Sequence, residues 1–338
     1  MTTTLSPSLE RSMDSFRSAM QAAVARMDPS SAAVSAYHLG WSAADGTPLQ
    51  APSGKGVRPT LALLSAQAGG AEAEAGIPAA VAVELVHNFS LLHDDVMDGD
   101  TERRHRPTVW TLWGVPSAIL TGDAMLAVAA EVLVDSGSEH ALEALRLMLS
   151  TTRELIHGQV EDLQFESRES VDLQQCQQMA ARKTGALIAA SAVLGCVLVG
   201  GDPAVARALD RYGQALGVAF QLVDDLLGIW GDPAVTGKPV LSDLRARKRS
   251  LPVTYAVSQD EAAGRRLADW LSGRTTEDEA GLRRIAEEIE ATGARNWASG
   301  QAGWHLRQAE QALAESSIPS ALQAEFMTVA RFVVDREF

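Results

Sequence analysis

Apolar residues recur three and four positions apart along almost the whole chain, a spacing that places them on one face of an α-helix. Alternating runs rich in Val, Ile, Thr and aromatic residues, which would indicate strands, are hard to find. We therefore expect an all-α fold built as a bundle of long helices, roughly 15 to 30 residues each. Breaks rich in turn-forming residues are expected at 46–56, 99–107, 199–203, 231–239 and 272–278.

The size and charge of the chain limit its organisation and its partners. It has 338 residues, of which 46% are hydrophobic and 21% charged, enough to bury a large core. No stretch is long or biased enough to be a linker, so we expect one domain over residues 1–338. The net charge of −14 argues against nucleic acid as a partner, although a local group of arginines can bind a small phosphate-containing ligand.

Cysteine usage and the apolar runs indicate the compartment. Cys176 and Cys196 lie in apolar helical sequence and provide neither a disulfide framework nor a zinc site. The first residues contain neither a basic leader nor an apolar core, so no secretory signal is expected. The longest apolar run, at 186–201, is shorter than the ~18 to 20 residues that cross a bilayer. We expect a buried helix there, no membrane span and a cytoplasmic protein.

An acidic segment, DDVMD at 94–98, ends one apolar helical stretch. With Asp94 set at 0° and 100° per residue, Asp98 falls at about 40° and His87 at about 20°, opposite the apolar stripe. Asp94 and Asp98 lie one turn, ~6 Å, apart, so their carboxylates can bind the same divalent ion. Oxygen ligands favour Mg²⁺ or Mn²⁺ over zinc. The alternative is an ordinary solvated helix end.

A second acidic pair, Asp224 and Asp225, follows another apolar helix, in FQLVDD at 220–225. A glycine-rich loop with Lys238 and a basic segment that ends at Lys248 come after it. Two such pairs, each followed by cations, are improbable as a surface coincidence. Together they predict a clamp in which three metal ions hold a diphosphate, and the two pairs must then face each other.

The motifs of the chain occur in a recognisable order. They are GKGVRP at 54–59, DDVMD, the pair Arg103 and Arg104, KTG at 183–185, and FQLVDD with its Phe-Gln. In this order, over about 50–252, they resemble the motifs of the head-to-tail trans-prenyltransferases, or polyprenyl diphosphate synthases. The resemblance implies the isoprenoid synthase type I fold, in which antiparallel helices surround a central cavity. It also implies an enzyme, and a homodimer.

The resemblance implies a role for individual residues. Asp94, Asp98 and Asp224 would bind magnesium directly, with Asp95 and Asp225 in support. The diphosphate of isopentenyl diphosphate would be bound by Lys55, Arg58, His87 and Arg104. The allylic diphosphate would be held by Arg103, Lys183, Lys238 and Lys248. Thr184 and Gln221 would line the space near the breaking bond, and Asp243 would contact a metal through water.

The chain departs from the family pattern in two segments. Ser53 replaces a glycine and Gly56 stands where many members have a larger residue, which we expect to change the stiffness of that loop rather than binding. Gly228 occupies the third acidic place of the second motif, on the face that would point to the site. The missing acid resembles a group that contacts metal through water, so activity should survive. Asp232 could partly replace it if the helix continues.

The residues before Asp94 bear on product length. Ser90 lies one turn below Asp94, where a small residue leaves room for a growing prenyl tail. Phe89 holds the position where the family often places an aromatic stop, but ideal geometry turns it about 140° away from Asp94. Either the helix is distorted or a neighbouring helix supplies the stop. The pattern resembles synthases of C20 geranylgeranyl diphosphate, with C15 farnesyl diphosphate as the alternative.

Two rival functions are less well supported by the motifs. A terpene cyclase would need no isopentenyl site and usually carries an Asn-Asp-x-x-Ser-x-x-x-Glu segment, which is absent. A non-catalytic partner subunit would have lost its acids, and here only the acid at position 228 is missing.

Overall fold

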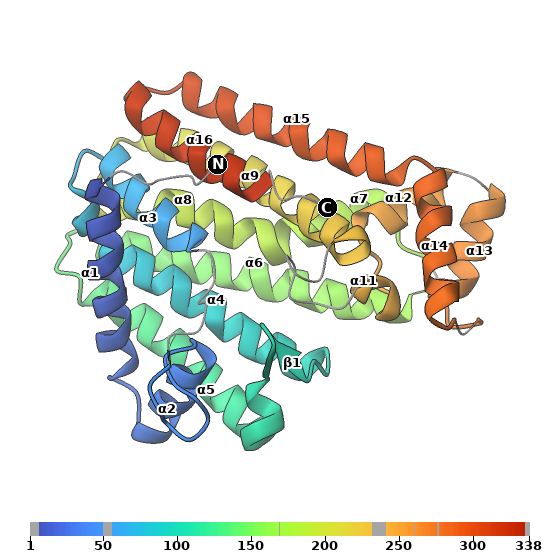
Figure 1. The fold of residues 1–338 in the computed structure, drawn as a ribbon. Helices are drawn as coiled ribbons and strands as arrows, with labels where there is room; N and C mark the ends of the chain where they lie inside the picture. The colour runs from blue at the N-terminus through green and yellow to red at the C-terminus, as the bar shows by residue number, and fades with distance from the viewer. Residues whose placement is uncertain are drawn as a thin grey trace. The chain divides into compact units, whose positions relative to one another are not determined.

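The computed structural model describes residues 7–49, 56–168, 170–231, 241–259, 261–275 and 277–334 (Figure 1). Helices dominate these ranges, so the predicted all-α fold is confirmed. The helices before the second acidic motif are α1 (Pro7–Val24), α2 (Pro29–His38), α3 (Val57–Ala68), η1 (Ala73–Gly76), α4 (Ile77–Met97), α5 (Val109–Val134), α6 (Ala141–Ser167), α7 (Leu173–Ala180), η2 (Ala181–Gly185) and α8 (Ala186–Leu198). The remaining helices are α9 (Pro203–Trp230), α11 (Ser242–Arg245), α12 (Leu251–Gln259), α13 (Glu261–Leu271), α14 (Glu279–Ala291), α15 (Ala294–Ala314) and α16 (Ser320–Val334).

One predicted break contains a structure that periodicity did not indicate. Residues 99–107 form an antiparallel hairpin of two short strands, β1 (Glu102–Arg103) and β2 (Arg106–Pro107), after α4 (Figure 1). Two-residue strands are too short to produce an alternating pattern, so the sequence shows only a break. The breaks expected at 199–203 and 272–278 separate α8 from α9 and α13 from α14.

The chain divides into two compact units, each assembled from three separate segments. Unit 1 comprises Met1–Thr152, Ala190–Asp210 and Leu313–Val329. Unit 2 comprises Arg153–Ala189, Arg211–Ala312 and Ala330–Phe338. The single domain over 1–338 stays a prediction.

The core of unit 1 is built on α3 and α4, which are buried over most of their length. Small residues let α8 approach α3 closely: a Cβ added at Gly195 would lie 2.5 Å from Ser65 Oγ and 2.8 Å from Ala66 N. Such a contact requires glycine, because any larger side chain would separate the helices. α4 also packs along α5. This packing fixes the helices that carry Arg58 and the first acidic motif.

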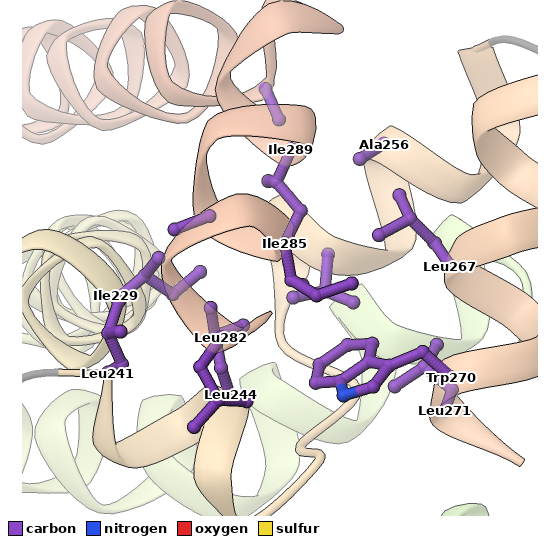
Figure 2. Close-up of a cluster of buried hydrophobic side chains, with 13 residues drawn as sticks. Ile229, Leu241, Leu244, Ala256, Leu267, Trp270, Leu271, Leu282, Ile285 and Ile289 are labelled. Atoms are coloured by element: carbon purple, nitrogen blue, oxygen red, sulfur yellow. The ribbon is translucent and has the colours of Figure 1, made fainter. Parts of the chain in front are cut away.

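The core of unit 2 surrounds the segment that follows the second acidic motif. Figure 2 shows this buried apolar cluster, in which Trp270 is the largest side chain. Its aliphatic members come from the end of α9, from α11 and from α12 to α14; they include Ile229, Leu244, Leu267, Leu282, Ile285 and Ile289. The cluster anchors α9 and α11, and thereby the residues on both sides of 232–240.

Three helical stretches are long and apolar enough to cross a membrane by length and composition: Ala73–Met97, Val109–Val134 and Leu173–Leu198. About two-thirds of the apolar window is buried inside the protein in the first and third, against 39% in the second. The second is α5, whose helical φ/ψ angles are interrupted at Gly114 (φ 82°, ψ 161°), two residues before Pro116. The absence of a membrane span stays a prediction.

Candidate active site

The first acidic motif ends helix α4. Asp98 is the C-cap residue, its φ and ψ of −81° and −11° remain right-handed, and its N–H donates to Asp94 O at 2.8 Å. The helical register therefore reaches Asp98, so Asp94 and Asp98 lie on one face a turn apart, as the spacing predicts. Asp94 is half-buried and Asp98 is exposed.

Asp95 lies on a different side of the helix and is only 2% exposed. Its Oδ1 accepts a hydrogen bond from Arg103 Nε at 2.8 Å and lies 2.7 Å from Arg103 Nη2. Desolvation raises the pKa of Asp95, and the Arg103 guanidinium opposes that shift. Its Oδ2 is buried and makes no hydrogen bond to any described residue. Asp95 therefore holds Arg103 in place, and its role at a metal stays a prediction.

The hairpin presents the arginine pair at its tip. Glu102 pairs with Pro107 and Arg103 with Arg106, which leaves Arg104 and His105 as the two turn residues. Both have positive φ, 51° and 58°, the conformation of the type I′ turn that suits two-residue hairpins. This conformation is costly for residues other than glycine, asparagine and aspartate.

The base of the hairpin is tied to the end of α4. Asp100 N–H donates to Asp95 O at 3.0 Å. Asp100 O in turn accepts from Thr108 Oγ1 at 2.8 Å and from Trp110 Nε1 at 2.7 Å. The strand that bears Arg103 therefore begins at a fixed place relative to the first acidic motif.

A second group of cations surrounds His87 on α4. Burial lowers the pKa of His87 well below its usual value, and Arg58, Arg104 and Arg103 lower it further. One turn earlier, burial raises the pKa of Glu84, which Arg58 and Arg104 oppose. Three guanidinium groups face only one carboxyl group, that of Glu84, whose raised pKa reduces its negative charge. The environment is therefore strongly positive and fits a diphosphate.

His38, at the end of α2, belongs to the same surroundings and was missed by sequence reasoning. Burial and the fields of Arg103 and Arg104 lower its pKa to about 3, so its imidazole is neutral. Its Nε2 is buried without a hydrogen bond to any described residue. No motif marks this histidine, because the fold alone brings α2 to the arginines.

The Lys-Thr pair lies in a single π-helical turn, η2. Ala186 N–H bonds to Ala181 O, a span of five residues in place of four. Such turns are frequent at functional sites. Lys183 Nζ donates to Asp162 Oδ2 on α6 at 2.5 Å, and Arg182 Nη1 donates to Glu161 Oε1 at 2.5 Å. Asp162 was not predicted; it could have been suspected only as an acid in the middle of a long helix.

Two glycines allow neighbouring helices to reach η2. A Cβ at Gly158 on α6 would overlap with Lys183 N and lie 2.7 Å from Lys183 Cα. A Cβ at Gly217 on α9 would lie 2.5 Å from Gly185 Cα. These distances are shorter than any real Cβ contact, so backbone packs directly on backbone here. α6 and α9 thus hold Lys183 and Thr184 from two sides.

In the second acidic motif the two carboxylates have different environments. Asp224 is exposed, whereas Asp225 is 5% exposed. Asp225 accepts hydrogen bonds from Gln221 Nε2 at 2.6 Å and from Leu251 N–H at 2.8 Å. Burial, with a contribution from Asp243, raises the pKa of Asp225 to about 8. Asp225 joins α9 to α12, while Asp224 remains available to an external ligand.

The space left by Gly228 is filled by Asp243. A Cβ at Gly228 would overlap with the Asp243 carboxylate and lie 2.8 Å from its Oδ1. Ser242 Oγ hydrogen-bonds to Gly228 O at 3.4 Å and to Asp243 Oδ1 at 3.4 Å. The carboxylate missing from the motif is therefore replaced in space by one from α11, whereas Asp232 lies outside the described residues.

The remaining predicted residues are placed as follows. Lys248 is exposed, and its N–H donates to Asp243 O at 2.8 Å. Gly56 caps α3 with φ 65°, a left-handed conformation that suits glycine. Lys55, Lys238 and Ser53 lie outside the described residues. Unit 1 holds Arg58, His87, Asp94, Asp95, Asp98, Arg103 and Arg104, and unit 2 holds Lys183, Thr184, Gln221, Asp224, Asp225, Asp243 and Lys248. That the two motifs face each other stays a prediction.

The donor set suits a hard divalent ion that is shared with a ligand. Among the described residues, no three His, Cys, Asp or Glu side chains lie close enough together to hold an ion. The first motif instead offers the carboxylates of Asp94 and Asp98, and the second offers that of Asp224, because Asp225 is buried and hydrogen-bonded within the protein. Magnesium is commonly bound by one or two carboxylates plus the phosphate oxygens of a substrate, so Asp94, Asp98 and Asp224 fit it in that form.

Comparisons with known proteins identify the family of the chain. The chain is 52% identical over 315 residues to the (2E,6E)-farnesyl diphosphate synthase of Mycobacterium tuberculosis, covering 92% of this chain and 88% of the relative. It is 45% identical over 261 residues to the geranylgeranyl diphosphate synthase of the same organism, covering 77% and 75%. The crystal structure of a polyprenyl synthetase from Streptomyces coelicolor superposes with a TM-score of 0.91 at 46% identity, covering 96% of this chain and 98% of that one. The polyprenyl synthetase family model matches residues 46–289. The chain therefore belongs to the polyprenyl synthetase family, whose members join isopentenyl diphosphate to allylic diphosphates.

Proposed function

We propose that the protein is a magnesium-dependent prenyltransferase that condenses isopentenyl diphosphate with an allylic diphosphate and releases C20 geranylgeranyl diphosphate. The observation that carries this proposal is the end of α4. There, two carboxylates one turn apart lie beside an arginine pair, and Ser90 lies one turn below Asp94.

The first step is heterolysis of the allylic carbon–oxygen bond, in which negative charge accumulates on the departing diphosphate. Fixed cations around that group stabilise the transition state more than the bound substrate. Arg103, held by Asp95, and Lys183, held by Asp162, are oriented for this task before substrate binds. Three Mg²⁺ ions, with Mn²⁺ as a substitute, would be bound by Asp94, Asp98 and Asp224 and would neutralise the leaving group.

This proposal gives supporting roles to four residues around the leaving group: Asp225, Thr184, Gln221 and Lys248. Gln221 donates to Asp225 and fixes the start of the second motif. Thr184 follows Lys183 in the same π-helical turn and would line the space near the breaking bond. Asp243 would contact a metal through water, and its position at the place of the missing acid, within the described residues, supports that role.

The second substrate is bound, in this proposal, by Arg58, His87 and Arg104. Neutral His87 can donate one N–H to a diphosphate oxygen, and the two arginines supply charge-assisted hydrogen bonds. Isopentenyl diphosphate needs no metal at this site because its diphosphate is not a leaving group in the reaction.

The packing of Phe89 supports the longer product. Its ring lies 4.7 Å from the His93 ring at 66°, and His93 Nε2 is 3.1 Å from Ile119 O on α5. A Cβ at Gly122 would lie 2.5 Å from His93 Nε2 and 3.5 Å from Phe89 Cδ2. Phe89 is thus directed at α5, away from the face of Asp94, as helix geometry predicts. Ser90 Oγ bonds to His87 O at 2.8 Å and adds no bulk below Asp94.

A C15 product is the second candidate. It is favoured by the 52% identity to a farnesyl diphosphate synthase over 92% of the chain, which exceeds the 45% identity to the geranylgeranyl diphosphate synthase.

The experiment is to incubate the purified chain with isopentenyl diphosphate and dimethylallyl, geranyl or farnesyl diphosphate, with Mg²⁺ or with a chelator. We expect metal-dependent elongation that ends at C20. An end at C15 would establish the second candidate. A cyclic hydrocarbon made without isopentenyl diphosphate would indicate a terpene cyclase, and no turnover would indicate a non-catalytic subunit.

We also propose that the protein is a cytoplasmic homodimer. Both cysteines are free and buried, which agrees with a reducing compartment. Helices α5 and α6 expose apolar side chains at helical spacing: Leu112, Val115, Ile119 and Leu120 on α5, and Leu142, Leu149, Ile156 and Val160 on α6. A second copy would cover two such stripes on each protomer. Sedimentation should show a dimer that Leu120→Lys with Leu149→Lys dissociates, whereas Trp304→Lys, at an exposed apolar residue of α15, should leave it intact.

A further inference from the structure

Two neighbouring arginines on the hairpin are held in different ways. Arg103 is fixed through its side chain, by two short contacts to the buried Asp95 carboxylate. Arg104 is exposed, and its guanidinium makes no hydrogen bond or ion pair to another residue within the described ranges. The direction of Arg104 therefore depends on the backbone of the turn that bears it.

That backbone is unfavourable by itself. Arg104 and His105 have φ of 51° and 58°, and neither is a residue type preferred at the two central positions of a type I′ turn. Each such residue strains the backbone, so the turn persists only if its surroundings hold it. The ladder is two residue pairs long and cannot do so alone.

Tyr37 and Arg106 supply the missing support. The Arg106 guanidinium carbon lies 4.0 Å from the centre of the Tyr37 ring. Nη1 donates to Tyr37 O and Nη2 to Ser42 O, each at 2.8 Å. Tyr37 Oη donates in return to Pro107 O at 2.8 Å, and Trp113 packs edge-on against the ring at 4.9 Å. We name Tyr37 and Arg106 the hairpin clamp.

The clamp acts on the strand opposite Arg103. Arg106 is the cross-strand partner of Arg103 and follows the turn directly, so it holds the side of the turn that Asp95 does not reach. Arg106 donates to the backbone carbonyl of Tyr37, in the last turn of α2, and to that of Ser42, after α2, and not to a carboxylate. Arg106 lowers the pKa of His38 together with Arg103 and Arg104, so its charge lies in their surroundings. Its planar fork is needed to reach both carbonyls at once.

We propose that Tyr37 and Arg106 are positioning residues for the second substrate: they hold the left-handed turn so that Arg104 points to the diphosphate of isopentenyl diphosphate. The proposal rests on the proposed function. Because Arg103 has its own anchor at Asp95, loss of the clamp should weaken the binding of isopentenyl diphosphate and spare that of the allylic diphosphate.

The test measures dissociation constants by calorimetry in Mg²⁺ buffer, with isopentenyl diphosphate and geranyl diphosphate as separate probes. Arg106→Gln should raise the dissociation constant of isopentenyl diphosphate about tenfold and that of geranyl diphosphate less than about twofold. Arg106→Lys keeps the cation over the ring but cannot reach both carbonyls. Its dissociation constant for isopentenyl diphosphate should lie between those of Arg106→Gln and the wild type. Tyr37→Phe keeps the ring and loses one hydrogen bond, and should weaken isopentenyl diphosphate about threefold.

Arg26→Gln is the matched control. It removes an exposed arginine of unit 1 whose partners are Glu131 and Asp135, away from the hairpin, and should change neither constant. Unchanged binding of isopentenyl diphosphate to Arg106→Gln and Tyr37→Phe would overturn the proposal. An equal loss for both ligands, with a lowered melting temperature, would also overturn it, since the clamp would then be general structural support. Failure of the wild-type protein to bind isopentenyl diphosphate would instead refute the proposed function.

Discussion

Replacement of Gly158 by alanine tests the close contact between α6 and the π-helical turn. In the interior of a helix, alanine is more favourable than glycine by about 1 kcal/mol. The added Cβ, however, would overlap with Lys183 N and lie 2.7 Å from Lys183 Cα and 2.9 Å from Arg182 C. These atoms are backbone, so they cannot move aside as a side chain would. Overpacking of this kind costs up to about 3 kcal/mol, which leaves a net destabilisation of about 2 kcal/mol.

The effect on activity should exceed the effect on stability. Relief of the overlap moves α6 away from η2, and with it Asp162, which holds Lys183 Nζ at 2.5 Å. We expect a melting temperature lower by roughly 3 °C and a turnover number lower by about tenfold or more.

Calorimetry and steady-state kinetics of the variant measure both effects. Gly300→Ala on α15 is the matched control, since no atom lies within 4 Å of its added Cβ and the same helix-propensity gain should raise stability by about 0.5 to 1 kcal/mol. If Gly158→Ala stabilised the protein as Gly300→Ala does, the proposed backbone contact would be refuted.

Three further outcomes are expected. Gly228→Asp should lower the stability of the protein and its metal-dependent activity, because the new side chain must displace the Asp243 carboxylate. The double change Gly228→Asp with Asp243→Gly should recover part of both. If it recovers neither, Asp243 does not take the place of the missing acid. In chelator, the free energy of unfolding should fall as pH rises from about 4 to 8, because the pKa of Asp225 is raised to about 8 and the folded protein holds a proton that the unfolded chain releases. In urea unfolding, the stability of Asp225→Asn should depend less steeply on pH. An unchanged dependence on pH would exclude Asp225 as its source. Ser90→Phe should shorten the product by one isoprene unit in chromatography, and an unchanged chain length would count against a tail that grows past Ser90.

The parts of the fold that depend on local sequence were predictable. Periodicity gave the helices, and glycine and proline marked the breaks. The register of Asp94 and Asp98 followed from 100° per residue, and the same rule turns Phe89 away from Asp94, toward the side where its ring lies beside His93 and near Gly122. These results depend on neighbours within two turns of one helix, which the sequence specifies directly.

What escaped prediction depends on residues far apart in the chain. Asp162 reaches Lys183 across 21 positions, and Arg106 reaches Tyr37 across 69. Asp243 occupies the space of a side chain at position 228 only because α11 returns to α9. No local pattern encodes such meetings, since each partner taken alone is an ordinary polar residue on a helix or in a loop. The hairpin was likewise predicted as a break, because its strands are too short for a period of two to be visible.

The wide turn at 181–185 also works as a spacer in the chain. Bonding from Ala186 back to Ala181 absorbs one more residue than an α-helical turn would, so α7 and α8 are offset by a single position, about 100° of rotation. A chain with one residue fewer in this stretch could run as an uninterrupted α-helix and would lose only that offset. The amine of Lys183 would then move away from α6. We therefore expect insertions and deletions in this stretch to leave the fold intact and to lower the activity.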